Sequence, residues 1–207
     1  LIVQKGPQPD DRELAALFEL LAEQVEPGDD LLLSGDASNF PGRDVYGLAQ
    51  DVLSGRNLRV FLDASGLSLK EGVKRKPFLI KPNLDELETL TGTKPRTDGD
   101  VVAAIRALAP LGIAVIAVSL GGEGSIVRTE DRLYRAHPPA VRVYNTVGCG
   151  DCYLAGMMHG FQQSMGVEDA LRFATAVSAA NAESPLSVGF DKERAEELLK
   201  LVQIERI

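Results

Sequence analysis

The stretch Tyr144-Asn145-Thr146-Val147-Gly148-Cys149-Gly150-Asp151-Cys152-Tyr153-Leu154-Ala155-Gly156 is the most informative part of the sequence for the fold. A β-branched run ends in a Gly-x-Gly turn, and the small and apolar residues after it predict a helix. Glycine lets the backbone approach a ligand closely, and the first N–H groups of a helix have no internal partners and favour an anion. The stretch therefore predicts an anion site at a strand-to-helix turn, with Asp151 at the start of that helix.

Asp151 has two interpretations at this point. An aspartate at the start of a helix can cap it by accepting a backbone N–H. The same carboxylate, beside an anion site, can take a proton from a hydroxyl that attacks a phosphate. Taken alone, the stretch leaves both roles open.

The rest of the chain alternates between helical and strand patterns. The predicted helices cover residues 10–25, 44–53, 66–75, 85–90, 98–108, 151–163, 167–182 and 192–202. The predicted strands cover residues 31–33, 58–62, 78–80, 113–118, 125–128, 132–136 and 141–144. Strands that are apolar throughout and separated by helices indicate an α/β fold, with a mainly parallel sheet covered on both faces.

Polar signatures follow nearly every predicted strand. They are residues 34–36, Asp63, residues 81–83, residues 119–124 and residues 145–151. In parallel sheets ligands bind beyond the carboxyl ends of the strands, so these segments are expected to share one edge. That common edge is the predicted functional site.

Composition and charge narrow the class of partner. The 207 residues are expected to form a single domain over residues 1–207, and a formal net charge of −8 argues against nucleic acid or an anionic membrane. No apolar run approaches the roughly 20 residues of a membrane span. Residues 1–6 are too short for a signal peptide, and two cysteines fit a reducing compartment, so a cytoplasmic protein is expected.

Three motifs in order carry a family resemblance. They are Lys81-Pro82-Asn83-Leu84-Asp85-Glu86-Leu87, Ser119-Leu120-Gly121-Gly122-Glu123-Gly124 and Asn145-Thr146-Val147-Gly148-Cys149-Gly150-Asp151. Together they resemble the PfkB (ribokinase-like) carbohydrate kinases over almost the whole chain. The Val60-Phe61-Leu62-Asp63-Ala64-Ser65-Gly66 stretch is most similar to members that phosphorylate fructose 1-phosphate, and the tagatose 6-phosphate kinases are the nearest neighbours.

The resemblance implies a ribokinase-like three-layer α/β/α domain that binds a nucleotide. Family members carry an N-terminal portion with a Gly-Gly-x-x-x-Asn sugar-binding motif and a β-sheet lid, and nothing in this sequence matches it. The chain is therefore expected to be the C-terminal, nucleotide-binding part of such a kinase, with the lid absent. In the family the lid often mediates dimers, which implies a homodimer for a full-length enzyme.

The resemblance also assigns catalytic roles. Asp151 is implied to be the base that deprotonates the sugar hydroxyl, and the N–H groups of Gly148, Cys149 and Gly150 the anion hole for the transferred phosphoryl group. Ser34 and Asp63 are implied, with Asp151, to contact the sugar phosphate. The implied substrates are ATP and a sugar phosphate, most closely fructose 1-phosphate, which would become fructose 1,6-bisphosphate.

Asn83 and Glu86 match an Asn-x-x-Glu element that the family uses to organise Mg²⁺, largely through water. The same spacing also makes a helix capping box, and the two roles are compatible. Lys81 has two interpretations, a contact with the nucleotide phosphates and a solvated strand end.

The nucleotide loop is implied to contain Ser119, Gly121, Gly122, Glu123 and Gly124. The same glycines are also a hairpin signal. Asn181 on the helix 167–182 has two interpretations, a place near the adenine and a solvated helix position.

Two departures from the family pattern leave alternatives open. Ser34-Gly35-Asp36-Ala37-Ser38-Asn39-Phe40-Pro41-Gly42 stands where the family often has Ser-Gly-Ser-Leu-Pro-Pro-Gly, and Asp36 would repel a phosphate unless it is paired or turned away. Cys149 replaces a more usual alanine or serine, and with Cys152 it forms a C-x-x-C typical of thiol–disulfide oxidoreductases. A nucleotide-binding fragment without catalysis is a third possibility.

Overall fold

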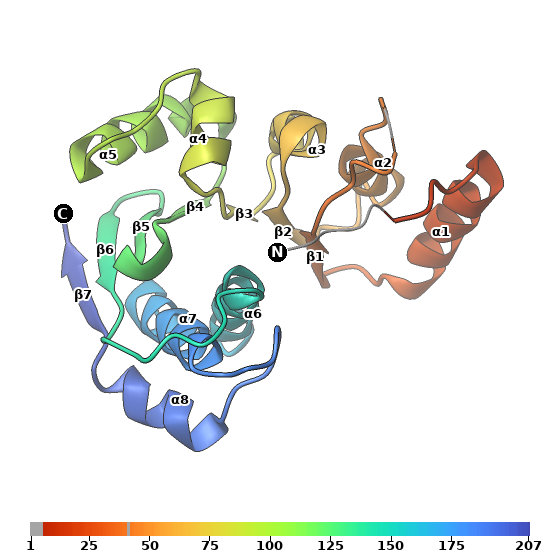
Figure 1. The fold of residues 1–207 in the computed structure, drawn as a ribbon. Coiled ribbons are helices and arrows are strands. Elements are labelled where there is room, and N and C mark those ends of the chain that lie inside the picture. The colour runs from red at the N-terminus through yellow and green to blue at the C-terminus, as the bar shows by residue number, and fades with distance from the viewer. Residues whose placement is uncertain (1–5, 41) are drawn as a thin grey trace.

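The computed structural model describes residues 6–40 and 42–207, and the strands in these ranges form one seven-stranded mixed sheet. The strands are β1 (Asp30–Ser34), β2 (Arg59–Asp63), β3 (Leu79–Ile80), β4 (Val115–Ser119), β5 (Ser125–Arg128), β6 (Leu133–His137) and β7 (Gln203–Arg206). They lie side by side in chain order (Figure 1). Strands β1 to β4 are parallel, and β5, β6 and β7 each add antiparallel to the strand before.

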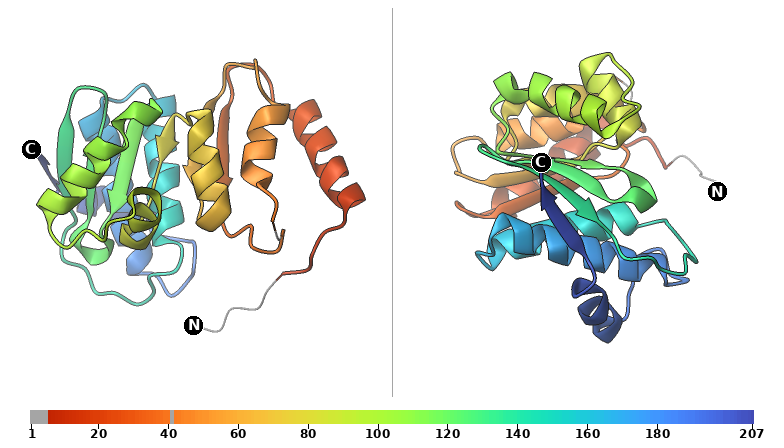
Figure 2. Two further views of the ribbon diagram at one scale, coloured as in Figure 1. Left: turned by 90° about the horizontal axis from the view of Figure 1, so that it is seen from above. Right: turned by 90° about the vertical axis from the view of Figure 1, so that its left-hand side faces the viewer.

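Helices cover both faces of this sheet, as the α/β prediction requires. The α-helices are α1 (Asp11–Gln24), α2 (Val45–Val52), α3 (Gly66–Gly72), α4 (Leu84–Thr91), α5 (Asp98–Ala107), α6 (Cys149–Gln162), α7 (Val167–Ala182) and α8 (Lys192–Leu199). Short 3₁₀ turns follow as η1 (Val73–Arg75), η2 (Ala109–Leu111) and η3 (Gly121–Glu123). Helices α1 to α5 lie on one side of the sheet and α6 to α8 on the other, which gives three layers (Figures 1 and 2).

Strand β4 shows how the two helical layers pack against opposite faces of the sheet. Ile116 and Val118 point into the core beneath α3 to α5, whereas Val115 and Ala117 point into the core formed with α6 and α7. A strand segment whose two faces are both buried must be apolar at every position, and the four buried residues of β4, Val115 to Val118, all are. Each fully buried side chain of this size contributes about 1.5–3 kcal/mol.

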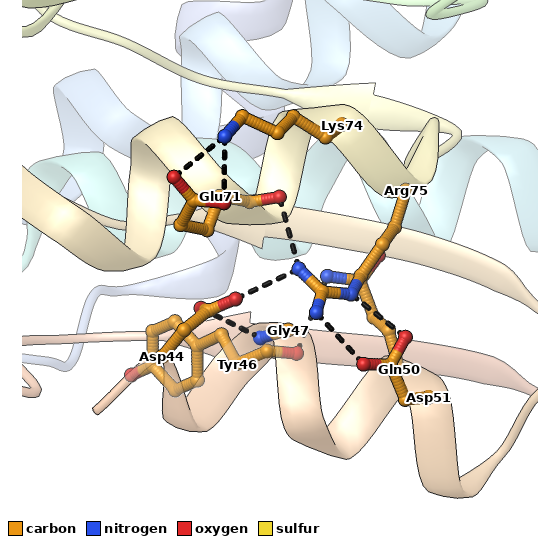
Figure 3. A network of polar contacts seen from close by, with 8 residues as sticks. All are labelled: Asp44, Tyr46, Gly47, Gln50, Asp51, Glu71, Lys74 and Arg75. Atoms are coloured by element: carbon orange, nitrogen blue, oxygen red, sulfur yellow. Dashed lines mark hydrogen bonds and ion pairs between the residues drawn. The ribbon is translucent and has the colours of Figure 1, made fainter.

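Arg75 ties the helices of the first layer together (Figure 3). From η1 its guanidinium donates to Asp51 at 2.8 and 2.7 Å and to Asp44 at 2.7 Å, both on or next to α2. The bidentate contact lowers the pKa of Asp51 below its ordinary value. Helices α2 and α3 are thereby held in a fixed relation over β1 and β2.

The structure corrects three sequence predictions. Residues 141–144 form no strand, although their β-branched pattern favours one, and the edge position beside β6 is filled by β7. Strand β7 has a single apolar residue, Ile204, which is why no pattern indicated it. Helix α6 begins at Cys149, two residues before the predicted start at Asp151.

In the described ranges, no helix is long and apolar enough to cross a bilayer.

Candidate active site

A cavity of about 470 Å³ lies at the carboxyl edge of the sheet, between the η3 turn and the first turn of α6. Five of the predicted nucleotide-binding residues line it: Lys81, Ser119, Gly121, Gly122 and Gly124. The hairpin interpretation of this loop also holds, because β4 and β5 are antiparallel neighbours joined through η3. Glu123 and Asn181 do not line the cavity.

The opposite wall of the cavity was not expected from the sequence. It consists of the irregular segment from Pro138 to Val143 and one face of α7. The α7 residues are Thr175, Ser178, Ala179 and Ala182. Their spacing of three to four residues is a signal that was available in the sequence, since it marks one helix face of small side chains.

Gly148 shapes the turn that leads into α6. It is the N-terminal cap residue, with φ +80°, and a Cβ placed there would lie 1.8 Å from the carbonyl oxygen of Ser187. Only glycine fits both the backbone angle and this contact. Because Gly148 occupies the cap position, the interpretation of Asp151 as the N-cap is wrong. Asp151 is the third helical residue, and its carboxylate is exposed.

The amides of this turn are not equivalent. The N–H of Cys149 donates to the carbonyl of Thr146 at 3.3 Å. Gly150 holds the second helical position, where an N–H has no acceptor within the helix. A Cβ on Gly150 would lie 3.1 Å from Nζ of Lys81, so the lysine ammonium lies against this turn. A backbone donor and a cation thus meet at the cavity.

Asp151 is held from the opposite side by Ser34. The Ser34 hydroxyl donates to Oδ1 of Asp151 at 3.1 Å, across 117 positions of sequence. Tyr46, which sequence reasoning missed, donates its hydroxyl to the carbonyl oxygen of Ser34 at 2.6 Å. Burial, together with the charges of Asp36 and Asp63, raises the pKa of Tyr46, which keeps this donor protonated. The carboxylate is therefore held by the Ser34 hydroxyl, and the backbone of Ser34 is held in turn by Tyr46.

Lys81 and Asp63 form an ion pair at 3.0 Å behind the turn. Lys81 is 6% exposed, so the interpretation of a solvated strand end is wrong. Burial raises the pKa of Asp63, the nearby Asp151 adds to the rise, and the Lys81 ammonium only partly opposes it. If either residue of this buried ion pair is removed, the other is left as a buried charge without a partner, which strongly destabilises the fold.

Asn83 and Glu86 form the predicted capping box at the start of α4. The Asn83 side chain accepts from the N–H of Glu86, and the Glu86 carboxylate accepts from the N–H of Asn83, both at 2.9 Å. Burial raises the pKa of Glu86, with the Asn83 hydrogen bond acting against it. No group of three His, Cys, Asp or Glu residues in the described ranges is arranged to hold a bare metal ion. The oxygen donors at this edge suit a hydrated Mg²⁺ contacted through water.

Asn181 is buried in α7, and its place near the adenine stays a prediction. It is fully buried, which rules out a solvated position, and its Nδ2 donates to the carbonyls of Val147 at 3.1 Å and Ser187 at 3.4 Å. Its Oδ1 accepts from the N–H of Gly189 at 3.0 Å. Asn181 therefore fastens the turn before α6 to the loop after α7 and does not line the cavity.

The two departures from the family pattern have structural outcomes. The Asp36 carboxylate accepts from the amide and hydroxyl of Ser38 at 2.8 and 2.7 Å, within its own turn. Pro41 of the same segment lies outside the described residues. Both cysteines are free thiols, and burial raises the pKa of Cys152. A raised pKa is the opposite of the activation that thiol–disulfide exchange needs.

Comparison with known proteins identifies the family. The family described as pfkB family carbohydrate kinase matches residues 7–191. The chain belongs to the PfkB family. Among curated relatives, the 1-phosphofructokinase of Bacillus subtilis is 30% identical over 203 residues, and that of Vibrio cholerae 34% over 205 residues. Each alignment covers 98% of this chain but only 66% and 64% of the relative, so the chain spans just under two thirds of their length.

A solved PfkB structure agrees with the fold. Phosphofructokinase-2 of Escherichia coli superposes with a TM-score of 0.88, covering 96% of this chain and 65% of that one. At 24% identity this likeness establishes the ribokinase-like α/β fold alone. The family resemblance and the fold class predicted from the sequence are both confirmed.

Proposed function

We propose that this chain carries the nucleotide-binding and phosphoryl-transfer part of a kinase that transfers the γ-phosphoryl group of ATP to a hydroxyl of a sugar phosphate. One observation carries the proposal. The Asp151 carboxylate, held by Ser34, stands one residue beyond the Gly150 amide and beside the cavity that Lys81 enters. A base, a backbone donor and a cation at one edge are the protein parts that phosphoryl transfer requires.

In this mechanism the sugar hydroxyl gives its proton to Asp151. The hydroxyl oxygen then forms a bond to the γ-phosphorus as the bond between that phosphorus and the β-phosphate oxygen breaks, and ADP leaves. The backbone N–H groups of Gly148 and Gly150 and the Lys81 ammonium are proposed to stabilise the charge on the transferred group. Cys149, the third predicted member of the anion hole, is left out because its N–H donates to the carbonyl of Thr146. When bound, Mg²⁺ neutralises phosphate charge, and the carboxylate of Glu86 and the side-chain oxygen of Asn83 would hold its water ligands.

Fructose 1-phosphate is the proposed acceptor, with fructose 1,6-bisphosphate as the product. The names of the two curated relatives support this choice, as does the sequence from Val60 to Gly66. Ser34 and Asp63 are proposed to lie on the sugar side of Asp151. Tagatose 6-phosphate is the nearest alternative acceptor.

Steady-state kinetics test the proposal. The protein expressed from its complete gene, and residues 1–207 beside it, are assayed with MgATP against fructose 1-phosphate, tagatose 6-phosphate and fructose 6-phosphate. The highest kcat/KM is expected for fructose 1-phosphate. ATP binding by calorimetry with no sugar-dependent release of ADP from the complete protein would favour a non-catalytic nucleotide-binding role instead.

The thiol–disulfide alternative has its own test. A Cys149→Ser/Cys152→Ser variant is expected to retain phosphoryl transfer, because the turn presents backbone groups to the nucleotide. Loss of kinase activity together with measurable disulfide exchange in the unchanged protein would favour the redox alternative.

A further inference from the structure

Arg135 on β6 is a buried charge that the proposed mechanism does not use. Its side chain is 8% exposed, and it lies on the sheet face that α5 covers. Its Nε pairs with Oδ2 of Asp98 at 2.7 Å, and Asp98, the first residue of α5, is itself 55% exposed. A buried guanidinium requires partners for its donors, so the question is what the remaining donors hold.

The remaining donors hold the turn at the cavity rim. Nη1 of Arg135 donates to the carbonyl oxygen of Glu123 at 2.7 Å and to that of Ala136 at 2.9 Å. Glu123 ends η3, the turn that brings Gly121 and Gly122 to the cavity. The guanidinium thus lies behind the turn, and the cavity lies in front of it.

The turn is also seated directly on the backbone of β6. Gly124 has φ +94°, and a Cβ there would lie 2.1 Å from the carbonyl oxygen of Ala136. That carbonyl is the second acceptor of Arg135. A single planar group therefore fixes both the turn and the strand against which the turn rests, because Nη1 makes both carbonyl contacts while Nε holds Asp98.

We propose that Arg135 is a positioning residue for nucleotide binding, which sets the place of Gly121 and Gly122 relative to the nucleotide and is itself oriented by Asp98. The inference rests on the proposed role of this cavity as the nucleotide site. A shift of the turn by a fraction of an ångström changes the contacts that its backbone offers, so affinity falls even where the fold survives.

Calorimetric titration with MgATP, without sugar phosphate, tests this in Arg135→Met and Arg135→Lys variants. The methionine removes all three contacts and is expected to raise the Kd about tenfold. Lysine keeps the charge but has a single nitrogen, so it cannot hold Asp98 and the two carbonyl groups at once as Nε and Nη1 do, and a rise of about threefold is expected. With saturating MgATP, kcat for phosphoryl transfer should stay within twofold.

Arg59→Met is the matched control. Arg59 forms a bidentate pair with Asp30 at 2.6 and 2.8 Å, joins β1 to β2 and does not line the cavity. The Arg59→Met variant should lower the melting temperature about as much as the Arg135 variants do, while leaving the Kd for MgATP unchanged. Equal Kd values for folded Arg135→Lys and Arg59→Met would overturn the inference. Failure of the unchanged protein to bind MgATP would instead overturn the proposed function on which the inference rests.

Discussion

The two halves of the sheet meet the site in different ways. In the parallel half, β1 to β4, charged and hydroxyl side chains extend from the strand ends, as in the Asp63–Lys81 pair and the Ser34–Asp151 contact. In the antiparallel half, β4 to β7, the cavity is bounded by the backbone of the η3 turn and by apolar residues of the segment from Pro138 to Val143. The side chains that contact Asp151 and Gly150 of α6 therefore come from the parallel half, and the antiparallel half shapes the cavity.

This division predicts separable defects. Substitution of Asp151, or of a site side chain of the parallel half that surrounds it, should lower turnover or break a buried charge pair. Substitution behind the η3 turn, as at Arg135, should change nucleotide affinity with turnover largely kept.

Asp151→Asn tests the first half of this statement and has the largest expected effect. Asparagine keeps an acceptor for the Ser34 hydroxyl but cannot take the proton, so kcat should fall by about 10² to 10⁴. Nucleotide affinity, measured by calorimetry, should change little. Ser34→Ala, which removes only the hydrogen bond, should lower kcat far less. Near-normal turnover of Asp151→Asn would show that another group is the base.

Lys81→Met tests whether Lys81 contributes to nucleotide binding in addition to stabilising the fold through its ion pair with Asp63. It leaves Asp63 buried without its cation, so the free energy of unfolding in urea should fall by about 3 kcal/mol. A Lys81→Met/Asp63→Asn double variant removes both charges and should recover most of that stability. It should not recover nucleotide affinity, because the ammonium beside Gly150 is still missing. Recovery of both properties would mean that Lys81 has only a structural role.

The same division explains what the sequence could predict. The strands of the parallel half are buried on both faces and end in polar motifs, so their place and their common edge were predictable. Strand β7 was not, because an edge strand that reads Gln203-Ile204-Glu205-Arg206 carries no apolar pattern. Residues 141–144 carry that pattern but serve as a cavity wall instead of a strand.

Long-range polar contacts were equally invisible in the sequence. The place of Asn181 depends on carbonyl groups 34 and 6 positions away, and no local spacing encodes them. Arg135 likewise belongs to a strand whose pattern explains its neighbours but not its own burial. Motifs therefore predicted which residues reach the edge, and tertiary contacts determined which of them face the cavity.

Two glutamate substitutions give the smallest effects, and they should have opposite signs. Burial raises the pKa of Glu86, in the parallel half, whereas Arg194 lowers the pKa of Glu183, at the end of the α7 helix that backs the cavity. Between the ordinary glutamate pKa of about 4.3 and the raised value, folded Glu86 binds more protons than the unfolded chain does. Stability therefore falls as pH rises through that window.

For Glu183 the sign is reversed. Its folded pKa lies below the ordinary value, so its contribution is present above about pH 4.3 and is lost as pH falls through the folded pKa. At pH 7 in EDTA, Glu86→Gln should raise the free energy of unfolding and Glu183→Gln should lower it, each by about 1 kcal/mol or less. Both differences should vanish well below pH 4, as urea titrations across pH can measure. If both variants changed the free energy of unfolding in the same direction at pH 7, burial would not be the dominant effect at Glu86. The Glu86 carboxylate would then behave like the paired carboxylate of Glu183.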